Sequence, residues 1–203
     1  MGNKKKERIK NVMSAVFEIP EEQIKDNSSP DTIESWDSLK HMNLIIALEE
    51  EFEVDVCLLE GEPVQGILGT KIPPNKNQVV KKIDEVSVDN YKLLVLPGGV
   101  KAMEKVRQEK KIIKFISEFD KKKKIIACIC SGAQLLISAK VVKGRKISGY
   151  YSMEDDLVNA GATYIDLPAV VDHNIVTTAH YKDLGPWMKA VLKVFYDKYK
   201  NQS

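Results

Sequence analysis

The stretch IIACICSGAQLL, residues 125–136, decides the fold of the second part of this chain. Its first half is a short apolar run, which predicts a strand buried on both faces, and its second half predicts a helix. A strand that becomes a helix within one or two residues forces a sharp turn at Cys130. A thiol at this turn lies near backbone N–H groups at the start of the helix. Those groups favour a thiolate, so we expect Cys130 to be reactive, with the N–H of Ser131 holding an oxyanion.

The segments around this stretch alternate between strands and helices. KLLVLPGG, residues 92–99, predicts another strand buried on both faces, ending in a glycine turn. Further on we expect helices over about 110–119 and 152–161, strands over 169–172 and 174–178, and a last helix with the apolar stripe Leu184, Trp187, Met188, Val191, Leu192 and Phe195. This alternation predicts an α/β domain with a mostly parallel sheet covered on both faces. Sites in such sheets lie at the carboxyl ends of strands, where the N–H of Gly99 is a second candidate oxyanion donor.

A buried structural thiol is the competing interpretation of Cys130. Its position at the end of a strand favours reactivity. Cys128, inside the same strand, and Cys57, in EVDVCLL (residues 53–59), are interpreted as core residues. The Cys-x-Cys spacing lacks a matching pair of Cys or His ligands, so no metal site is predicted.

Several blocks together resemble the ThiJ/PfpI family. They are LLVLPGG (93–99), IACICSGAQLL (126–136), VVKGRKISGYYSMEDDLVNAGATYID (141–166), VVDHNIVTT (170–178) and LGPWM (184–188). The resemblance spans residues 54–203 and implies a flavodoxin-like doubly wound fold, a homodimer, and a cysteine-dependent hydrolase or lyase with Cys130 as nucleophile. It implies a small-molecule or peptide substrate, with amidase, peptidase and glyoxalase or deglycase chemistry as the options. Amidase and peptidase members commonly have histidine after the cysteine, and Ser131 stands there in this chain, which disfavours a peptidase.

The same resemblance suggests two further site residues. His180, in TTAHYKDLG, falls in a loop that lies near the site in the family, which makes it a candidate general base for Cys130. Tyr150 falls in the family's active-site loop and could donate a hydrogen bond to substrate, although a tyrosine there could equally serve packing. His41 and His173 are expected on the surface or in the core, without a role at the site.

The N-terminal part has a different pattern. Apolar residues recur with helical spacing over residues 9–17, Pro20 stops that helix, and a second helix is expected from about Ser38 to Phe52. The ThiJ/PfpI family has its first strand in this region, followed by a glutamate close to the cysteine, and no such strand is visible here. An alternative is that residues 9–17 form the missing strand and Glu18 or Glu21 serves as the acid.

Residues 4–52 have a resemblance of their own, to the first half of an acyl carrier protein, carried by FEIPEEQIKDNSSPDTIESWDSLKHMNLIIALEEEF (17–52). It implies phosphopantetheine on Ser38, at the start of a helix whose N–H groups favour a phosphodiester. An unmodified helix-start serine is the equal alternative. We therefore expect an acyl-carrier-like helical segment over 1–52, truncated, and a ThiJ/PfpI-like domain over 53–203. A junction near Phe52 suggests a carrier or interaction protein, or a recombined or engineered chimera without catalysis, as alternative functions.

The composition narrows the classes of partner. The 203 residues carry a net charge of +2, with 43% hydrophobic and 30% charged residues. The basic runs lack interleaved aromatic residues, so nucleic-acid binding is not expected. No stretch approaches a membrane span, no secretory signal is visible, and the three cysteines form no disulfide framework. A cytoplasmic protein that needs no cofactor in its α/β domain is the expectation.

Overall fold

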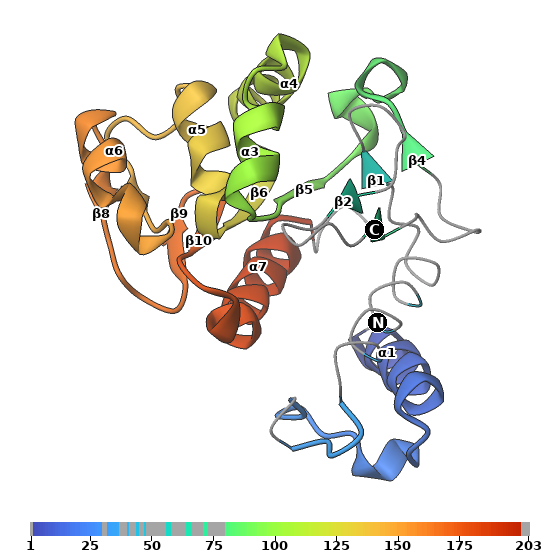
Figure 1. Ribbon diagram of the computed structural model, residues 1–203. Coiled ribbons are helices and arrows are strands. Elements are labelled where there is room, and N and C mark those ends of the chain that lie inside the picture. The colour runs from blue at the N-terminus through green and yellow to red at the C-terminus, as the bar shows by residue number, and fades with distance from the viewer. Residues whose placement is uncertain are drawn as a thin grey trace. The chain divides into compact units, whose positions relative to one another are not determined.

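The computed structural model describes residues 2–29, 32–36, 40, 44, 47, 56–57, 64–65, 71–72 and 80–199. The chain divides into two compact units, Met1–Glu85 and Val86–Ser203. Each unit is described by itself, and Figure 1 labels its elements.

A four-stranded sheet forms the centre of the second unit, in the order β5-β6-β10-β9. Strands β5 (Leu93–Leu96), β6 (Ile125–Ile129) and β10 (Ile175–Thr178) are parallel, and β9 (Val170–Asp172) pairs antiparallel with β10. The register places Leu96 opposite Cys128 and Thr178 opposite Ile129. The carboxyl ends of the three parallel strands therefore meet at one edge, which confirms a flavodoxin-like fold with a mixed sheet.

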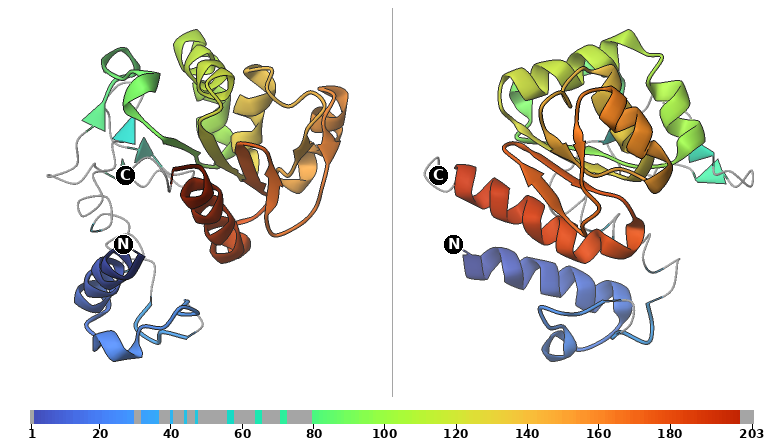
Figure 2. Two further views of the ribbon diagram at one scale, coloured as in Figure 1. Left: turned by 180° about the vertical axis from the view of Figure 1, so that it is seen from behind. Right: turned by 90° about the vertical axis from the view of Figure 1, so that its left-hand side faces the viewer.

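Helices cover both faces of this sheet. On one side lie α3 (Val100–Val106), α4 (Lys110–Lys121) and α5 (Ala133–Ser138), and on the other lies α7 (Leu184–Tyr199), as Figures 1 and 2 show. The side chains of β6 point alternately to the two faces of the sheet, because successive residues of a strand point to opposite faces. Ile126 and Cys128 join the core on the α3–α5 side, whereas Ala127 packs with Trp187 and Val191 of α7. The expected alternation of buried strands and covering helices is confirmed.

The remaining elements of this unit are short. They are α6 (Glu154–Asn159), the parallel pair β7 (Lys146–Ile147) and β8 (Thr163–Tyr164), and the 3-10 helices Val88–Asn90, Cys130–Gly132, Tyr151–Met153 and Tyr181–Asp183. The helix expected to stop at Gly161 does so through a left-handed turn, with φ of 87° at that glycine.

Two sequence predictions need correction here. The strand β5 is not buried on both faces, because Val95 is 47% exposed. Met188 and Leu192 of α7 are exposed, and the helix instead packs Ala190 and Val194 beside Trp187 and Val191. The helix α3 was not predicted from the sequence.

A mostly buried polar network joins α4 to the chain just before the first residues of β6 and β10. The carboxylate of Asp120, at the end of α4, pairs with Arg145 at 2.8 Å and accepts a hydrogen bond from the amide of Asn174 at 3.0 Å. Arg145 also donates to the amide oxygen of Asn174 at 3.1 Å, and Asn174 donates to the carbonyl of Lys124 at 2.9 Å. Since every charge in the network has a partner, burial of these groups is tolerated.

The first unit is built on α1 (Gly2–Phe17). Phe17, Ile33 and Leu44 form a small core, against which Trp36 packs with its ring centroid 4.4 Å from that of Phe17. The prediction that residues 9–17 are helical is thus confirmed, and the alternative that they form the missing first strand is wrong. The unit also contains the 3-10 helices Glu21–Gln23 and Ile83–Glu85, the parallel pair β1 (Val56–Cys57) and β4 (Val80–Lys81), and the antiparallel pair β2 (Val64–Gln65) and β3 (Lys71–Ile72).

The expected second helix of this unit lies mostly outside the described residues. Lys40, Leu44 and Ala47, which are described, are helical. Among the described residues no strand pairs with the outer edge of β5.

Candidate active site

The elbow, which is the sharp turn at Cys130 between β6 and the 3-10 helix Cys130–Gly132, has the strained backbone expected of a positioned nucleophile. Cys130 is partly exposed and adopts the left-handed conformation, with φ of 58°, which costs a non-glycine residue roughly 1 kcal/mol or more. Gly98 makes room for it: a Cβ placed on Gly98 would lie 2.8 Å from the Cβ and 3.3 Å from the Sγ of Cys130. The glycine turn after β5 and the turn after β6 are therefore packed together at the carboxyl edge of the sheet.

Small residues after the cysteine allow a second close approach. A Cβ on Gly132 would lie 2.6 Å from the carbonyl oxygen of Pro97, so the backbone of the elbow rests directly on the Pro97-Gly98-Gly99 turn. Gly99 has φ of 104° and precedes the first residue of α3. The N–H groups at the start of a helical segment lack intrahelical acceptors, which leaves those of Gly99 and Ser131 as donors for a negatively charged oxygen.

The other cysteine of the strand is a core residue, as expected. Cys128 is 1% exposed, and burial, together with the neighbouring Cys130, raises the pKa of its thiol well above the ordinary value. It therefore stays protonated and inert at neutral pH, whereas the thiol of Cys130 reaches solvent.

The loop that follows β7 is fastened to the elbow. The N–H of Tyr150 donates to the carbonyl of Cys130 at 3.2 Å, and the hydroxyl of Tyr164 donates to the carbonyl of Gly149 at 3.2 Å. The structure thus brings Tyr150 to Cys130, through the main chain. Tyr150 is 36% exposed, which leaves its side chain open to solvent beside the elbow.

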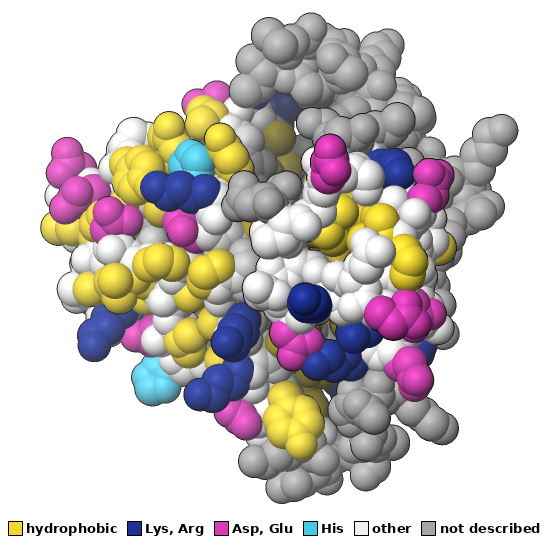
Figure 3. Space-filling view, turned by 90° about the horizontal axis from the view of Figure 1, so that it is seen from below, with side chains coloured by type: hydrophobic (Ala, Val, Ile, Leu, Met, Phe, Trp, Pro, Cys, Tyr) yellow, Lys and Arg dark blue, Asp and Glu magenta, His cyan; other side chains and the backbone are white. Residues whose placement is uncertain are grey.

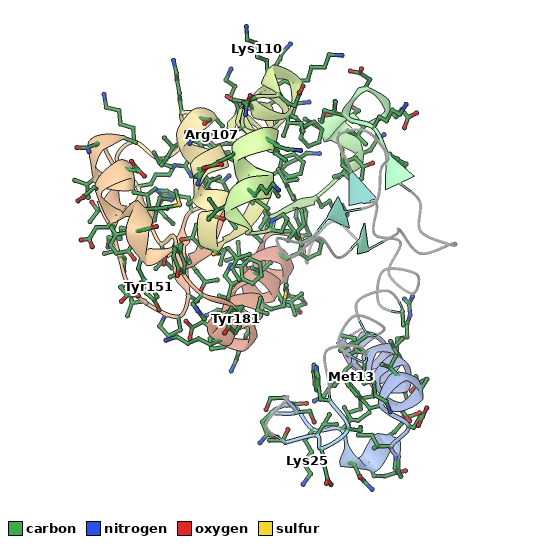
Figure 4. All side chains as sticks on the ribbon, viewed as in Figure 1. Met13, Lys25, Arg107, Lys110, Tyr151 and Tyr181 are labelled. Carbon is green, nitrogen blue, oxygen red and sulfur yellow. The ribbon has the colours of Figure 1, made fainter. Side chains whose placement is uncertain are left out.

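His180 lies two residues beyond the end of β10, whose Thr178 is paired with Ile129, so it reaches the same edge of the sheet as Cys130. Its ring stacks on Tyr151, with centroids 6.2 Å apart, and lies against Tyr181, with centroids 4.0 Å apart. Figure 4 shows Tyr151 and Tyr181 at one end of the second unit, and Figure 3 shows hydrophobic side chains gathered on the surface that is seen from below.

The hydrogen bonding of His180 bears on its expected role. Its Nδ1 accepts a hydrogen bond of 3.2 Å from the backbone N–H of Lys182. In the neutral ring this leaves the proton on Nε2, so that nitrogen can donate but cannot accept a proton. The arrangement thus suits a hydrogen-bond donor better than the general base expected from the sequence.

Three buried hydroxyls near this edge have no hydrogen-bond partner among the described residues: Ser131 Oγ, Ser148 Oγ and Thr178 Oγ1. Ser131 follows the cysteine, Thr178 ends β10, and the N–H of Ser148 donates to the neighbouring Thr177 at 2.8 Å. Unpartnered buried polar groups in a native fold call for a water or a ligand atom. These three hydroxyls could not be predicted from the sequence, because their burial depends on the tertiary packing.

The remaining candidates lie in other parts of the chain. Glu18 and Glu21 belong to the first unit, where Glu18 is exposed and pairs with Lys40 at 3.5 Å. Because α1 is a helix, the strand that was to present them is absent. Ser38 and His41 lie outside the described residues, and His173 is an exposed turn residue with φ of 51°. Among the described residues, no side chain hydrogen-bonds to the Sγ of Cys130.

The described residues contain no group of three or more His, Cys, Asp or Glu side chains placed to hold a metal ion. No described helix has the length and apolar character to cross a membrane.

Comparisons with known proteins agree with the fold. The model of the DJ-1/PfpI family matches residues 26–194. Deglycase PfpI of Pyrococcus furiosus is 39% identical over 146 residues, which are 72% of this chain and 84% of that protein. Deglycase TK1284 of Thermococcus kodakarensis is 38% identical over 164 residues, 79% of this chain and 95% of that protein. DJ-1beta of Drosophila melanogaster has a similar fold, with a TM-score of 0.62 at 24% identity, covering 77% of this chain and 83% of its own.

These comparisons give no support to an acyl carrier protein. The family match begins at residue 26, inside the segment 4–52 that resembles a carrier.

Proposed function

Because this chain belongs to the DJ-1/PfpI family, we propose that it is a cysteine-dependent hydrolase of the deglycase type, with Cys130 as its nucleophile. The observation that carries the proposal is the left-handed backbone of Cys130, held against Gly98 at the carboxyl edge of the sheet. Strain of this kind persists where the surrounding structure enforces it, and it is concentrated at functional sites.

In the first chemical step, the thiolate of Cys130 bonds to the former carbonyl carbon that carries the amine, the C–N bond breaks, and the amine leaves with a proton. A proton then moves from that carbon to the neighbouring carbonyl carbon, and the hydroxyl proton passes to the carbonyl oxygen, so the sulfur-bearing carbon becomes a thioester and the neighbouring carbon an alcohol. The N–H groups of Gly99 and Ser131 hold the oxygen on which negative charge develops, and the Nε2–H of His180 is a further donor. Water then breaks the S–C bond of the thioester, which releases a 2-hydroxy carboxylic acid and returns the thiol.

The substrate class follows from the relatives that are named deglycases. We propose adducts between an amine and a reactive dicarbonyl compound, which present a carbonyl carbon to the thiol. Net cleavage consumes one water and releases the free amine and a carboxylic acid. The aromatic side chains of Tyr150, Tyr151 and Tyr181 offer an exposed apolar surface beside the elbow for such a ligand.

The test is the release of free amine from an N-acetyl-arginine adduct made with methylglyoxal, followed by NMR. Wild-type protein should release the amine in a catalytic manner, and Cys130→Ser should abolish release while keeping the wild-type melting temperature. Cys57 is exposed and not a core residue as the sequence suggested, so Cys57→Ser, which removes this thiol of the first unit, is the matched control and should retain activity. Equal release by the Cys130→Ser variant would refute the assignment of the nucleophile.

A further inference from the structure

A second hollow, apart from the cysteine edge, lies on the outer surface of the second unit. It is a surface pocket of about 410 Å³ lined by residues of α4, the end of α5 and Arg107, which follows α3. Figure 4 places Arg107 and Lys110 on the α3–α5 side of the unit, away from Tyr151 and Tyr181. Arg107 follows the end of α3 that is remote from Gly99, so the pocket is distinct from the candidate active site.

The lining of this pocket is strongly basic. Five cations, Arg107, Lys110, Lys114, Lys121 and Lys140, line it, together with one carboxylate, Glu118. The Nζ of Lys114 lies 3.7 Å from that carboxylate. Lys110, Lys121 and Lys140 make no ion pair with any described residue, so the pocket carries an excess of positive charge.

The helix α4 concentrates this charge on one face. Lys110, Lys114 and Lys121 recur at intervals of four and seven residues, which places their side chains on the same side of the helix. Like charges one turn apart on a helix repel each other and destabilise it. A bound anion would remove this repulsion, whereas the described protein groups offset only the charge of Lys114.

The guanidinium of Arg107 is already oriented in the pocket. Its Nε donates to the hydroxyl of Ser138 at 3.2 Å, and its Nη1 donates to the amide oxygen of Gln134 at 3.3 Å. Both acceptors lie on α5, so the planar fork is held in one position. A guanidinium fixed in this way suits the oxygens of a phosphate better than a freely rotating cation does.

We propose that this pocket binds a small ligand that carries two or more phosphate groups. Its volume lies in the range of about 300–1,000 Å³ typical of small-molecule sites. None of its lining residues is aromatic, and the apolar ones are Ile113 and Ala139. A single-stranded nucleic acid would need stacking surfaces for its bases, so the chemistry favours compact phosphates.

The experiment uses pyrophosphate as the probe and isothermal titration calorimetry on the full chain at constant ionic strength. Wild-type protein should bind pyrophosphate saturably. The double variant Lys110→Gln/Lys140→Gln should bind about tenfold more weakly or worse, because each lost charge removes a charge-assisted hydrogen bond. Arg107→Lys, which keeps the charge but loses the fixed fork, should also weaken binding.

The matched control is Lys189→Gln/Lys193→Gln, which removes the same charge from exposed positions of α7 on the other face of the sheet. It should bind pyrophosphate as the wild type does. Absence of saturable binding, or equal losses in the pocket and control variants, would overturn the proposal. If a single-stranded oligonucleotide bound through the same residues more tightly than pyrophosphate, the proposal of a small phosphate ligand would be wrong and the pocket would be a nucleic-acid site. Cys130→Ser protein should bind normally, since the proposal does not depend on catalysis.

Discussion

Gly98 and Cys130 are packed so closely that no side chain fits between them: a Cβ on Gly98 would lie 2.8 Å from the Cβ of Cys130. We therefore predict that Gly98→Ala displaces the thiol, destabilises the protein by about 1–3 kcal/mol and lowers kcat/KM by more than the stability loss explains. Chemical denaturation and steady-state kinetics measure the two effects. Gly185→Ala, whose added Cβ meets no atom within 4 Å, is the control and should leave activity unchanged. Full activity in Gly98→Ala would contradict the packing argument.

The two cysteines of β6 and its elbow should differ sharply towards iodoacetamide. Burial raises the pKa of the Cys128 thiol, so in native protein at neutral pH it should be alkylated at least about a hundredfold more slowly than Cys130, since reaction requires opening of the core. Site-resolved mass spectrometry of digested samples measures both rates. In denaturant the difference should vanish. Equal native rates would show that the strand is not buried as described.

The buried network around Asp120 should contribute strongly to stability. Asp120→Ala leaves the mostly buried Arg145 without its carboxylate and Asn174 without one of its two acceptors, so we expect a loss of about 3–5 kcal/mol in the free energy of unfolding. Urea denaturation followed by circular dichroism measures it. The comparison is Glu118→Ala, which breaks an exposed pair with Lys114 and should cost less than about 0.5 kcal/mol. Similar losses in both variants would mean that the network carries no special stability.

Alkaline pH should weaken the hydrogen bond by which Tyr164 holds the loop at Gly149 beside the elbow. Burial, with smaller effects from nearby Asp166, Glu154 and Tyr151, raises the pKa of Tyr164 above its ordinary value of 10. A raised folded-state pKa means that the stabilisation is complete below the unfolded pKa and is lost as the pH rises through the folded pKa, above about 10. Tyr164→Phe should thus show a shallower decline in unfolding free energy above that pH than wild type does.

Measurement of the same variant at neutral pH separates this effect from the loss of the Tyr164 hydrogen bond to Gly149, which should cost about 0.5–1.5 kcal/mol. An unchanged alkaline slope in Tyr164→Phe would contradict the raised pKa.

The elbow could be predicted from the sequence because its causes are local. A buried strand that runs into small residues and a helix leaves Cys130 little choice of backbone, and the structure places it as expected. The role of Gly98 could be predicted only in part. The glycine turn was predicted from the sequence, but the contact of Gly98 with Cys130 depends on the pairing of β5 with β6.

The hydrogen bonding of His180 could not be predicted for a related reason. Its Nδ1 is occupied by the N–H of a residue two positions on, which depends on the turn adopted after β10. The exposure of Val95 likewise depends on the tertiary packing around β5, and the continuous apolar run of β5 does not contain that information.

The placement of tryptophan makes the two units separately observable. The chain has two tryptophans, and Trp36 packs on Phe17 in the first unit while Trp187, 2% exposed, donates its Nε1–H to the carbonyl of Val176 in the second. In a Trp36→Phe protein, fluorescence would therefore report melting of the sheet alone, and in a Trp187→Phe protein it would report the small helical core alone. The chain thus carries its own pair of optical probes for asking whether the units unfold together or in succession.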